Sequence, residues 1–324
     1  MRLAVSVLVI LWSAFLGCGG SNEELSGYHP NPTFRQPEVI SGAGQLFCWS
    51  GSGQISSRKL LCIHGRCLGE HPDGLAPSTV ERMFASKLTQ ISTACEETYN
   101  NYLGNKAEIW FYTYDTHQDI DKIVDDLAGY LRALGWQGCR VCVIGYSQGG
   151  VIAWELQKQY PEFIDGAITL GAPVDGTPLA SSVLVNDVAA KYFPALPEGL
   201  LWKSALILTK GADELVLSRP ERTASNFLMI AGQIPAPPPS RFTLNFIDVL
   251  AAAADNLFAE EVINTDTRQH AELGATIIAN AEWREEGTAN RQSDGMVPVS
   301  SAIYGAEVSE IWQGRRLRHR LDLC

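Results

Sequence analysis

Short apolar runs alternate along this chain with stretches whose apolar residues recur at helical spacing. Between Ile120 and Leu134, for example, apolar residues return every three or four positions, and Gly135 ends the pattern. Such alternation is typical of βαβ units, in which a helix connects two parallel strands. We therefore predict an α/β fold with a mostly parallel central sheet and helices on both of its faces. Strands are expected at Lys59–Ile63, Ala107–Tyr112, Arg140–Ile144, Gly166–Leu170, Phe227–Ala231 and Glu307–Trp312, and helices at Pro77–Tyr99, His117–Leu134 and Gln148–Tyr160.

The size and charge of the chain exclude some classes of protein. Its 324 residues, of which 46% are hydrophobic, can form one large domain with a full core. The net charge is −11, and no run of Lys and Arg precedes the short basic cluster at residues 315–320. Because a polyanion would be repelled by such a charge, we expect no binding to nucleic acid.

The first residues have the pattern of an export signal. Arg2 is followed by an apolar run over residues 3–16, which is too short to cross a bilayer as a helix but has the length of a secretory signal. The run ends at Gly17-Cys18, a junction that resembles bacterial lipoprotein signals, in which the cysteine receives a lipid after cleavage. We expect a signal peptide over 1–17, a polar linker over 18–45 and one domain over 46–324. The protein is then exported, and is either anchored to a membrane (the outer membrane first) through lipidated Cys18 or secreted.

Eight cysteines bear on the same question. Export permits disulfides, and lipidation of Cys18 would leave an odd number of thiols, so at least one would stay outside a bridge. Cys62 and Cys142 lie in apolar strand-like runs and are expected to be small buried residues. The lone Cys-x-x-Cys pair, Cys139 and Cys142, lacks the partners that a zinc site needs. The better candidates for bridges lie near the ends of elements: Cys67, Cys95, Cys139 and Cys324.

One hexapeptide joins a predicted strand to a predicted helix, and its sequence is Gly145-Tyr146-Ser147-Gln148-Gly149-Gly150. A strand before it and a helix after it are the context that a G-x-S-x-G nucleophile elbow requires. The turn is so sharp that the serine takes a strained backbone conformation, and the residues two before and two after it must be small. Ser147 would then project above the sheet at the positive end of a helix. The pattern predicts Ser147 as a nucleophile.

Three other segments extend the pattern, and they are Leu60–Gly65, Gly171–Thr177 and Ser293–Pro298. Together with the elbow they resemble bacterial triacylglycerol lipases and esterases of the α/β-hydrolase superfamily, over about residues 58–180 and 290–320. The resemblance implies the α/β-hydrolase fold and a serine hydrolase that cleaves carboxylic esters. The elbow alone also resembles cutinases, but this chain is long for one, and the Gly171–Thr177 segment fits lipases better.

The resemblance also implies a role for each matched residue. Ser147 would attack the ester carbonyl and form an acyl-enzyme. The backbone N–H groups of Arg66 and Gln148 would form the oxyanion hole, so that the side chains of these two residues need not matter. His64 precedes the oxyanion loop and is expected to make structural hydrogen bonds instead of acting as the base.

The acid and the base each have more than one candidate. In this fold the triad runs along the chain in the order Ser, acid, His. Only His270 and His319 follow Ser147, and only His319 follows Asp294, which lies in the Ser-Asp-Gly turn that best matches the family. The predicted triad is therefore Ser147, Asp294 and His319, and His270 becomes possible if an earlier aspartate is the acid. The alternative acids are Asp213 and Asp175.

The interval of about 179–290 is long for a simple connection and rich in apolar residues. It is predicted to form a helical cap or lid insertion over Ser147, and the alternative is a helical layer packed permanently on the core. The chemistry needs no metal and no organic cofactor. Some bacterial lipases hold a structural calcium through an aspartate shortly after the catalytic histidine, but here Leu321 takes that place and Asp322 comes one residue later.

The expected partner is an ester or lipid substrate, together with a membrane if Cys18 is lipidated. Three alternatives keep the fold and the triad, namely a thioesterase, an amidase and an acyltransferase. A fourth alternative belongs to another class, a noncatalytic hydrolase-like binding protein on the cell surface.

Overall fold

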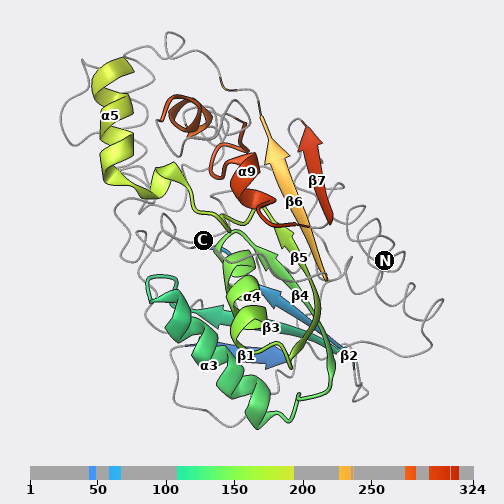
Figure 1. Cartoon of the computed structure of the whole chain (residues 1–324). Helices are drawn as coiled ribbons and strands as arrows, with labels where there is room; N and C mark the ends of the chain where they lie inside the picture. The colour runs from blue at the N-terminus through green and yellow to red at the C-terminus, as the bar shows by residue number, and fades with distance from the viewer. Residues whose placement is uncertain are drawn as a thin grey trace, which may run out of the picture.

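The computed structural model describes residues 44–48, 58–66, 108–192, 226–234, 236, 274–281, 292–306 and 308–313. In this part of the chain seven strands form one sheet in the order β1-β3-β2-β4-β5-β6-β7 (Figure 1). β1 pairs antiparallel with β3, and the other five pairings are parallel. The strands are β1 (Gly44–Cys48), β2 (Arg58–Ile63), β3 (Glu108–Tyr114), β4 (Arg140–Tyr146), β5 (Ile164–Leu170), β6 (Phe227–Gln233) and β7 (Val308–Gln313).

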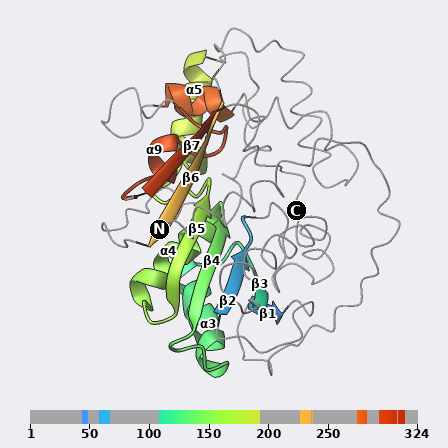
Figure 2. The ribbon, with the colours of Figure 1, turned by 90° about the vertical axis from the view of Figure 1, so that its right-hand side faces the viewer.

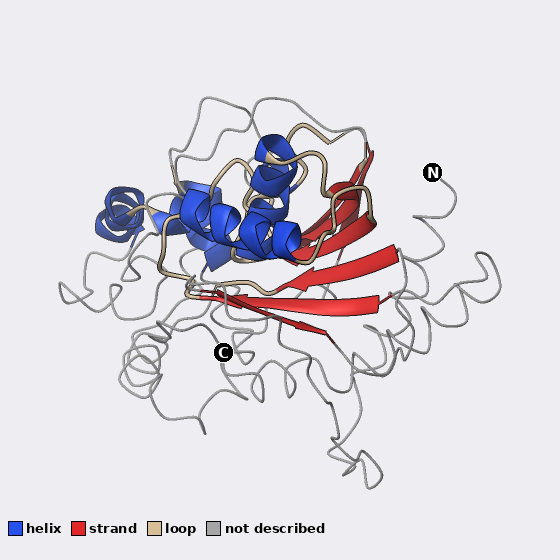
Figure 3. Cartoon of the chain, turned by 90° about the horizontal axis from the view of Figure 1, so that it is seen from below, coloured by secondary structure: helices blue, strands red, loops and turns tan. Residues whose placement is uncertain are grey.

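The described helices are α3 (Ile120–Ala133), α4 (Gln148–Gln159), α5 (Ser182–Tyr192) and α9 (Val299–Ala302), with a 3₁₀ turn η1 (Pro178–Ala180) before α5. Residues 274–280 are helical as well. In Figure 3 these helices all lie to one side of the sheet. The predicted helix over Pro77–Tyr99 lies outside the described residues. The described residues therefore do not test the prediction that helices cover both faces.

The six predicted strands and the helices of α3 and α4 are confirmed, and their bounds differ from the expected ones by a few residues. The pattern over His117–Leu134 misplaced the start of a helix, because α3 begins only at Ile120. The preceding residues form a turn in which the N–H of His117 donates to the Asp115 carboxylate at 2.9 Å. A local side-chain acceptor thus takes the place of the first helical hydrogen bonds.

One strand was not predicted, the edge strand β1. It has five residues and finds its place only by pairing with β3, in a register that sets Leu46 opposite Tyr112. Strands this short carry a weak local signal, and most of their stability comes from their neighbours. β1 also begins at Gly44, two residues before the start that the sequence suggested for the domain.

The main hydrophobic core lies between the sheet and the helices α3 and α4. α3 buries one face, which contains the fully covered Val124, Leu127 and Leu131. α4 is packed more deeply, and its Trp154 ring meets Phe227 of β6 edge-to-face at 5.2 Å. Full burial of each large apolar side chain contributes about 1.5–3 kcal/mol, so this layer holds α4 firmly against the sheet.

A buried ion pair lies at the opposite end of the strands from the Ser147 elbow. Lys59 and Glu108 are register partners on β2 and β3, and their side chains form an ion pair that is almost completely covered. Glu108 also accepts a hydrogen bond from the Trp110 indole at 3.0 Å. Because the carboxylate is both paired and hydrogen-bonded, the cost of burying it is largely offset.

Part of the interval predicted as a cap or lid belongs to the sheet. β6 lies inside the range 179–290 and pairs with β5 and β7. The interval therefore contains a core strand, while α5 stands away from the sheet (Figures 1 and 2). No helix among the described residues is long and apolar enough to cross a bilayer.

Candidate active site

Ser147 lies at the sharp junction between β4, which ends at Tyr146, and α4, which begins at Gln148. Its backbone angles are φ 52° and ψ −123°, and no other non-glycine residue in the described ranges has a positive φ. Such a conformation costs roughly 1–3 kcal/mol and persists only where the surroundings enforce it. The Ser147 N–H donates to Leu170 O at 2.9 Å, and the Gly150 N–H donates to Ser147 O at 2.9 Å.

Glycines make this junction possible because the backbone approaches itself closely there. A Cβ on Gly145 would meet Gly149 O at 2.5 Å, and a Cβ on Gly149 would meet Ile63 O at 2.3 Å. The first contact lies within the elbow, whereas the second joins the elbow to the end of β2. A Cβ on Gly65 would in turn meet the Cβ of Ser147 at 2.9 Å. The loop after β2 therefore lies directly against the nucleophile candidate.

The loop after β2 contains the predicted oxyanion residue Arg66 and the buried His64. The backbone carbonyl of His64 accepts a hydrogen bond from the Tyr114 hydroxyl at 2.7 Å, and the two rings stack with centroids 4.5 Å apart. Nδ1 of His64 lies 2.6 Å from Gly65 O. These contacts agree with the structural role expected for His64, since they hold the strand end that leads to Arg66.

Gln148, the other predicted oxyanion residue, is the first residue of α4. The N–H groups in the first turn of a helix have no partner within that helix, and they carry the positive end of its dipole. A backbone donor therefore follows Ser147 directly. The structure brings Ser147, Gln148 and the Gly65 loop that leads to Arg66 together at the carboxyl ends of β2 and β4, where open parallel sheets place their ligand sites.

Asp294 lies in a turn beside the carboxyl end of β6, where Ser293 bridges Ile234. Its side chain is 2% exposed, and Oδ1 accepts the N–H groups of Met296 and Val297, both at 2.9 Å. The carboxylate thus shapes its own turn. The two N–H donors hold the carboxylate in one orientation within the turn.

Two segments from elsewhere in the chain support the Asp294 turn. The Thr177 hydroxyl donates to Met296 O at 2.7 Å. A Cβ on Gly274, in the helix 274–280, would lie 1.9 Å from Gly295 O. The loop after β5 and this helix therefore both contact the turn.

The alternative acid Asp175 also lies near this edge, in the loop after β5. It is 8% exposed, and its N–H donates to the Ser301 hydroxyl of α9 at 3.0 Å. The two acid candidates occupy neighbouring loops. Three other candidates, Asp213, His270 and His319, lie outside the described residues, so the complete triad stays a prediction.

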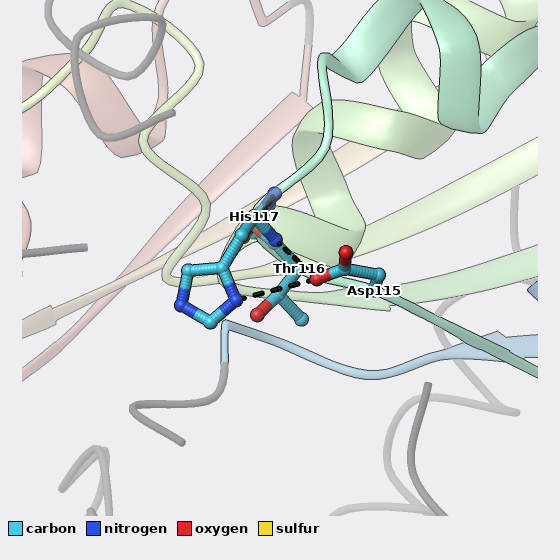
Figure 4. Close-up of polar contacts among 4 residues, drawn as sticks. Asp115, Thr116 and His117 are labelled. Carbon is cyan, nitrogen blue, oxygen red and sulfur yellow. Dashed lines mark hydrogen bonds and ion pairs between the residues drawn. The ribbon is translucent and has the colours of Figure 1, made fainter. Parts of the chain in front are cut away.

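One feature of the site was missed by the sequence reasoning, a polar contact between α4 and the turn after β3. The Gln148 side chain donates through Nε2 to Thr116 O at 3.2 Å. In the same turn the His117 Nδ1 lies 3.3 Å from Asp115 Oδ1 (Figure 4). The Asp-x-His spacing directly after a strand could have indicated this turn, because aspartate side chains often accept the N–H two residues on.

The described residues contain no group of three or more His, Cys, Asp or Glu side chains that could hold a metal ion. Cys139 was expected as a candidate for a bridge, but it forms no disulfide and packs, partly buried, against the main core. Cys139 lies in the turn between α3 and β4, where its side chain contacts apolar residues of the core and not a second thiol.

Comparisons with known proteins give short or distant likenesses. No protein-family model matches the sequence. Over 58 residues the chain is 31% identical to epoxide hydrolase 1 of Caenorhabditis elegans. The matched segment makes up 18% of this chain and 14% of the length of that protein. Among solved structures, the mature lipase of Bacillus licheniformis aligns over 82% of this chain and 86% of its own, at 14% identity and a TM-score of 0.43. A serine hydrolase of Cycloclasticus zankles aligns over 90% and 93%, at 13% identity and a TM-score of 0.36.

The fold is defined by the chain's own geometry. The strand order, the antiparallel edge strand followed by parallel pairings, and the strained Ser147 between β4 and α4 match the pattern of the α/β-hydrolase fold. This chain has the α/β-hydrolase fold.

Proposed function

We propose that this protein is a serine hydrolase that cleaves carboxylic esters, an esterase or lipase, through an acyl-enzyme on Ser147. The observation that carries the proposal is the backbone of Ser147, at φ 52° and ψ −123° between a strand and a helix N-terminus. A fold keeps a strained non-glycine residue where its position serves a purpose, and a serine strained in this way between a strand and a helix is the pattern of a nucleophile elbow. The half-buried serine stands beside the Gly65 loop and the first turn of α4.

In the proposed reaction, Ser147 Oγ attacks the ester carbonyl, and the alcohol leaves as the acyl-enzyme forms. Negative charge develops on the carbonyl oxygen, and we assign its stabilisation to the backbone N–H groups of Gln148 and Arg66. Each such donor contributes about 3–4 kcal/mol to the transition state in comparable hydrolases. Water then attacks the acyl-enzyme and releases the acid.

The proposal assigns proton transfer to His319 and the orientation of its ring to Asp294. Oδ1 of Asp294 is engaged by the N–H groups of Met296 and Val297. His319 lies late in the chain, after β7, which agrees with the order Ser, acid, His.

The same triad could act on thioesters or amides, or could transfer the acyl group to an alcohol. We favour esters because the segments after β2, β5 and β6 resemble those of lipases, and no observation on the described residues favours the other three reactions. We further propose that the protein is exported through residues 1–17 and is anchored to a membrane through Cys18. The apolar run that ends at Gly17-Cys18 supports this.

The enzymatic proposal is tested with p-nitrophenyl esters of increasing chain length and with a fluorophosphonate probe. We expect ester hydrolysis, labelling of Ser147 alone, and loss of both in Ser147→Ala. Parallel thioester and amide substrates separate the related reactions. A folded wild-type protein that neither reacts with the probe nor cleaves any of the three bonds would be a noncatalytic binding protein instead.

The base is tested with a matched pair of variants. His319→Ala should lose nearly all turnover, whereas His270→Ala should keep it. The opposite result would move the base to His270 and the acid to Asp213. The anchor is tested by mass spectrometry of the mature protein, which should begin at an acylated Cys18; an unmodified N-terminus at another residue contradicts that part of the proposal.

A further inference from the structure

The side chain of Gln148 is almost completely buried, at 1% exposure, although it follows the nucleophile candidate directly. Burial of an amide costs free energy unless the amide is hydrogen-bonded. Its Nε2 donates to Thr116 O at 3.2 Å, across the gap between α4 and the turn after β3. An apolar side chain could be buried at this position at a lower cost in free energy. What the amide provides, and an apolar side chain does not, is the hydrogen bond to Thr116 O.

The acceptor of this bond is itself held in place. Thr116 is 3% exposed and lies in the turn that Asp115 stabilises by accepting the His117 N–H at 2.9 Å. In Figure 4 one nitrogen of the His117 ring faces the Asp115 carboxylate, and the rest of the ring points away from it. The Asp115 carboxylate thus fixes the peptide whose carbonyl Gln148 contacts.

The same turn also supports the other side of the site. Tyr114, two residues before Thr116, donates its hydroxyl to His64 O at 2.7 Å. His64 leads into Arg66, and Gln148 follows Ser147. The end of β3 therefore contacts both segments to which the oxyanion donors are assigned.

We propose that Gln148 is a positioning residue, whose side-chain bond to Thr116 O orients its own backbone N–H toward the forming oxyanion. This inference rests on the proposed function and corrects the expectation that the Gln148 side chain need not matter. The side chain touches no substrate and acts through the peptide of its own residue. The carbonyl of the same peptide, Ser147 O, accepts the Gly150 N–H at 2.9 Å, and the Gln148 side chain adds a second contact, from outside the elbow, that limits its movement.

The experiment compares two glutamines at the two ends of α4. Gln148→Met keeps the length of the side chain and removes its donor. Gln159→Met is the matched control, because Gln159 donates Nε2 to Asp121 at 2.9 Å on the exposed face, far along the helix from Ser147. Turnover is expressed per active site, titrated with the fluorophosphonate probe, so that unfolded protein does not enter the rate.

We expect Gln148→Met to lower kcat roughly tenfold with KM nearly unchanged, since the lost interaction acts only in the transition state. The affinity for an alkyl boronic acid, which forms a tetrahedral adduct with the serine, should weaken by a similar factor. Gln159→Met should match the wild type in both measurements. A purely structural role of Gln148 would lower the melting temperature and leave kcat per site unchanged, and that result overturns the inference.

A second variant, Gln148→Glu, tests whether the hydrogen bond to Thr116 O depends on a proton that the side chain can donate. The ionised carboxylate repels Thr116 O, whereas the protonated carboxyl can donate to it, and burial favours the protonated form. The ratio of the variant's kcat to that of the wild type should therefore rise as the pH is lowered from 8 toward 5. A flat ratio overturns the inference.

If Gln148→Met does not fold, Asp115→Ala replaces it, since loss of that carboxylate loosens the turn that holds Thr116. The expected signature is the same fall in kcat at constant KM. Wild-type protein that neither hydrolyses esters nor reacts with the probe overturns the proposed function and this inference together. Active wild-type protein with an unchanged Gln148→Met overturns this inference alone.

Discussion

The nucleophile elbow and the Asp294 turn lie at the same edge of the sheet, but they are stabilised in different ways. The elbow is crowded by backbone, within itself, where a Gly145 Cβ would meet Gly149 O at 2.5 Å, and from the end of β2, where a Gly149 Cβ would meet Ile63 O at 2.3 Å. The Asp294 turn is held by a carboxylate that accepts two N–H groups, and by contacts from Thr177 and the helix 274–280. These supporting segments are far away in the sequence.

The two parts of the candidate site therefore depend on different interactions, the elbow on close backbone packing and the Asp294 turn on hydrogen bonds. The elbow tolerates almost no added atom, because a Cβ has no room beside the backbone of neighbouring residues. The Asp294 turn tolerates changes of shape better, but it depends on charge and on several polar partners. Substitutions should therefore act on the elbow through sterics and on the turn through hydrogen bonds.

The largest effect should follow the loss of the proposed nucleophile. Ser147→Ala should reduce ester hydrolysis by at least about a thousandfold and leave thermal stability nearly unchanged. Ser147→Gly should be equally inactive but more stable than Ser147→Ala by about 1 kcal/mol, since glycine accepts φ 52° without strain. Steady-state kinetics and urea unfolding measure the two quantities. An alanine variant with more than a few per cent of wild-type turnover contradicts the assignment.

The next largest effect should follow the loss of the charge in the turn. Asp294→Asn should lower kcat by about 10²–10⁴-fold if Asp294 is the acid of the proposed triad, because a neutral amide does not stabilise a charged histidine. Its stability should fall by only about 1 kcal/mol, since an amide oxygen can still accept the N–H groups of the turn. Asp175→Asn is the control, and it should retain most activity. If Asp175→Asn lowers kcat more than Asp294→Asn does, Asp175 is the acid.

Steric pressure at the elbow should produce a loss of stability. Gly149→Ala places a Cβ only 2.3 Å from Ile63 O and should destabilise the protein by roughly 2–3 kcal/mol. Gly129→Ala on α3 is the control, because its Cβ meets nothing within 4 Å. That change should stabilise the protein by about 0.5–1 kcal/mol through helix propensity. Equal unfolding free energies for both variants would refute the crowding of the elbow.

The smallest effect should come from the polar support of the turn. Thr177→Val removes the donor to Met296 O and should cost about 1 kcal/mol of stability, with a few-fold fall in kcat. Thr113→Val is the control, since its hydroxyl contacts Gln45 O at 3.5 Å beside the edge strand β1. It should leave kcat unchanged. A Thr177→Val variant with wild-type kcat would show that the turn keeps its shape without this contact.

Much of the fold could be predicted because strands and helices have different periods. The apolar spacing on α3 and the short runs of β2, β4 and β5 give these elements before any contact is known. The edge strand β1 could not be found in this way, because five residues carry too weak a pattern. The early start assigned to α3 was wrong because the carboxylate of Asp115 competes locally with helical hydrogen bonds.

The elbow could be read from the sequence alone, because Gly145, Ser147 and Gly149 form a local pattern between a strand and a helix, and a Cβ on Gly145 would clash with Gly149 O four residues on. It also indicated the loop after β2, because the strand runs directly into Gly65. The tertiary structure decided which polar groups meet, such as Gln148 with Thr116 and Thr177 with Met296. Hydrogen bonds of this kind depend on how distant segments pack, and packing is set by the whole core, so no local pattern contains them.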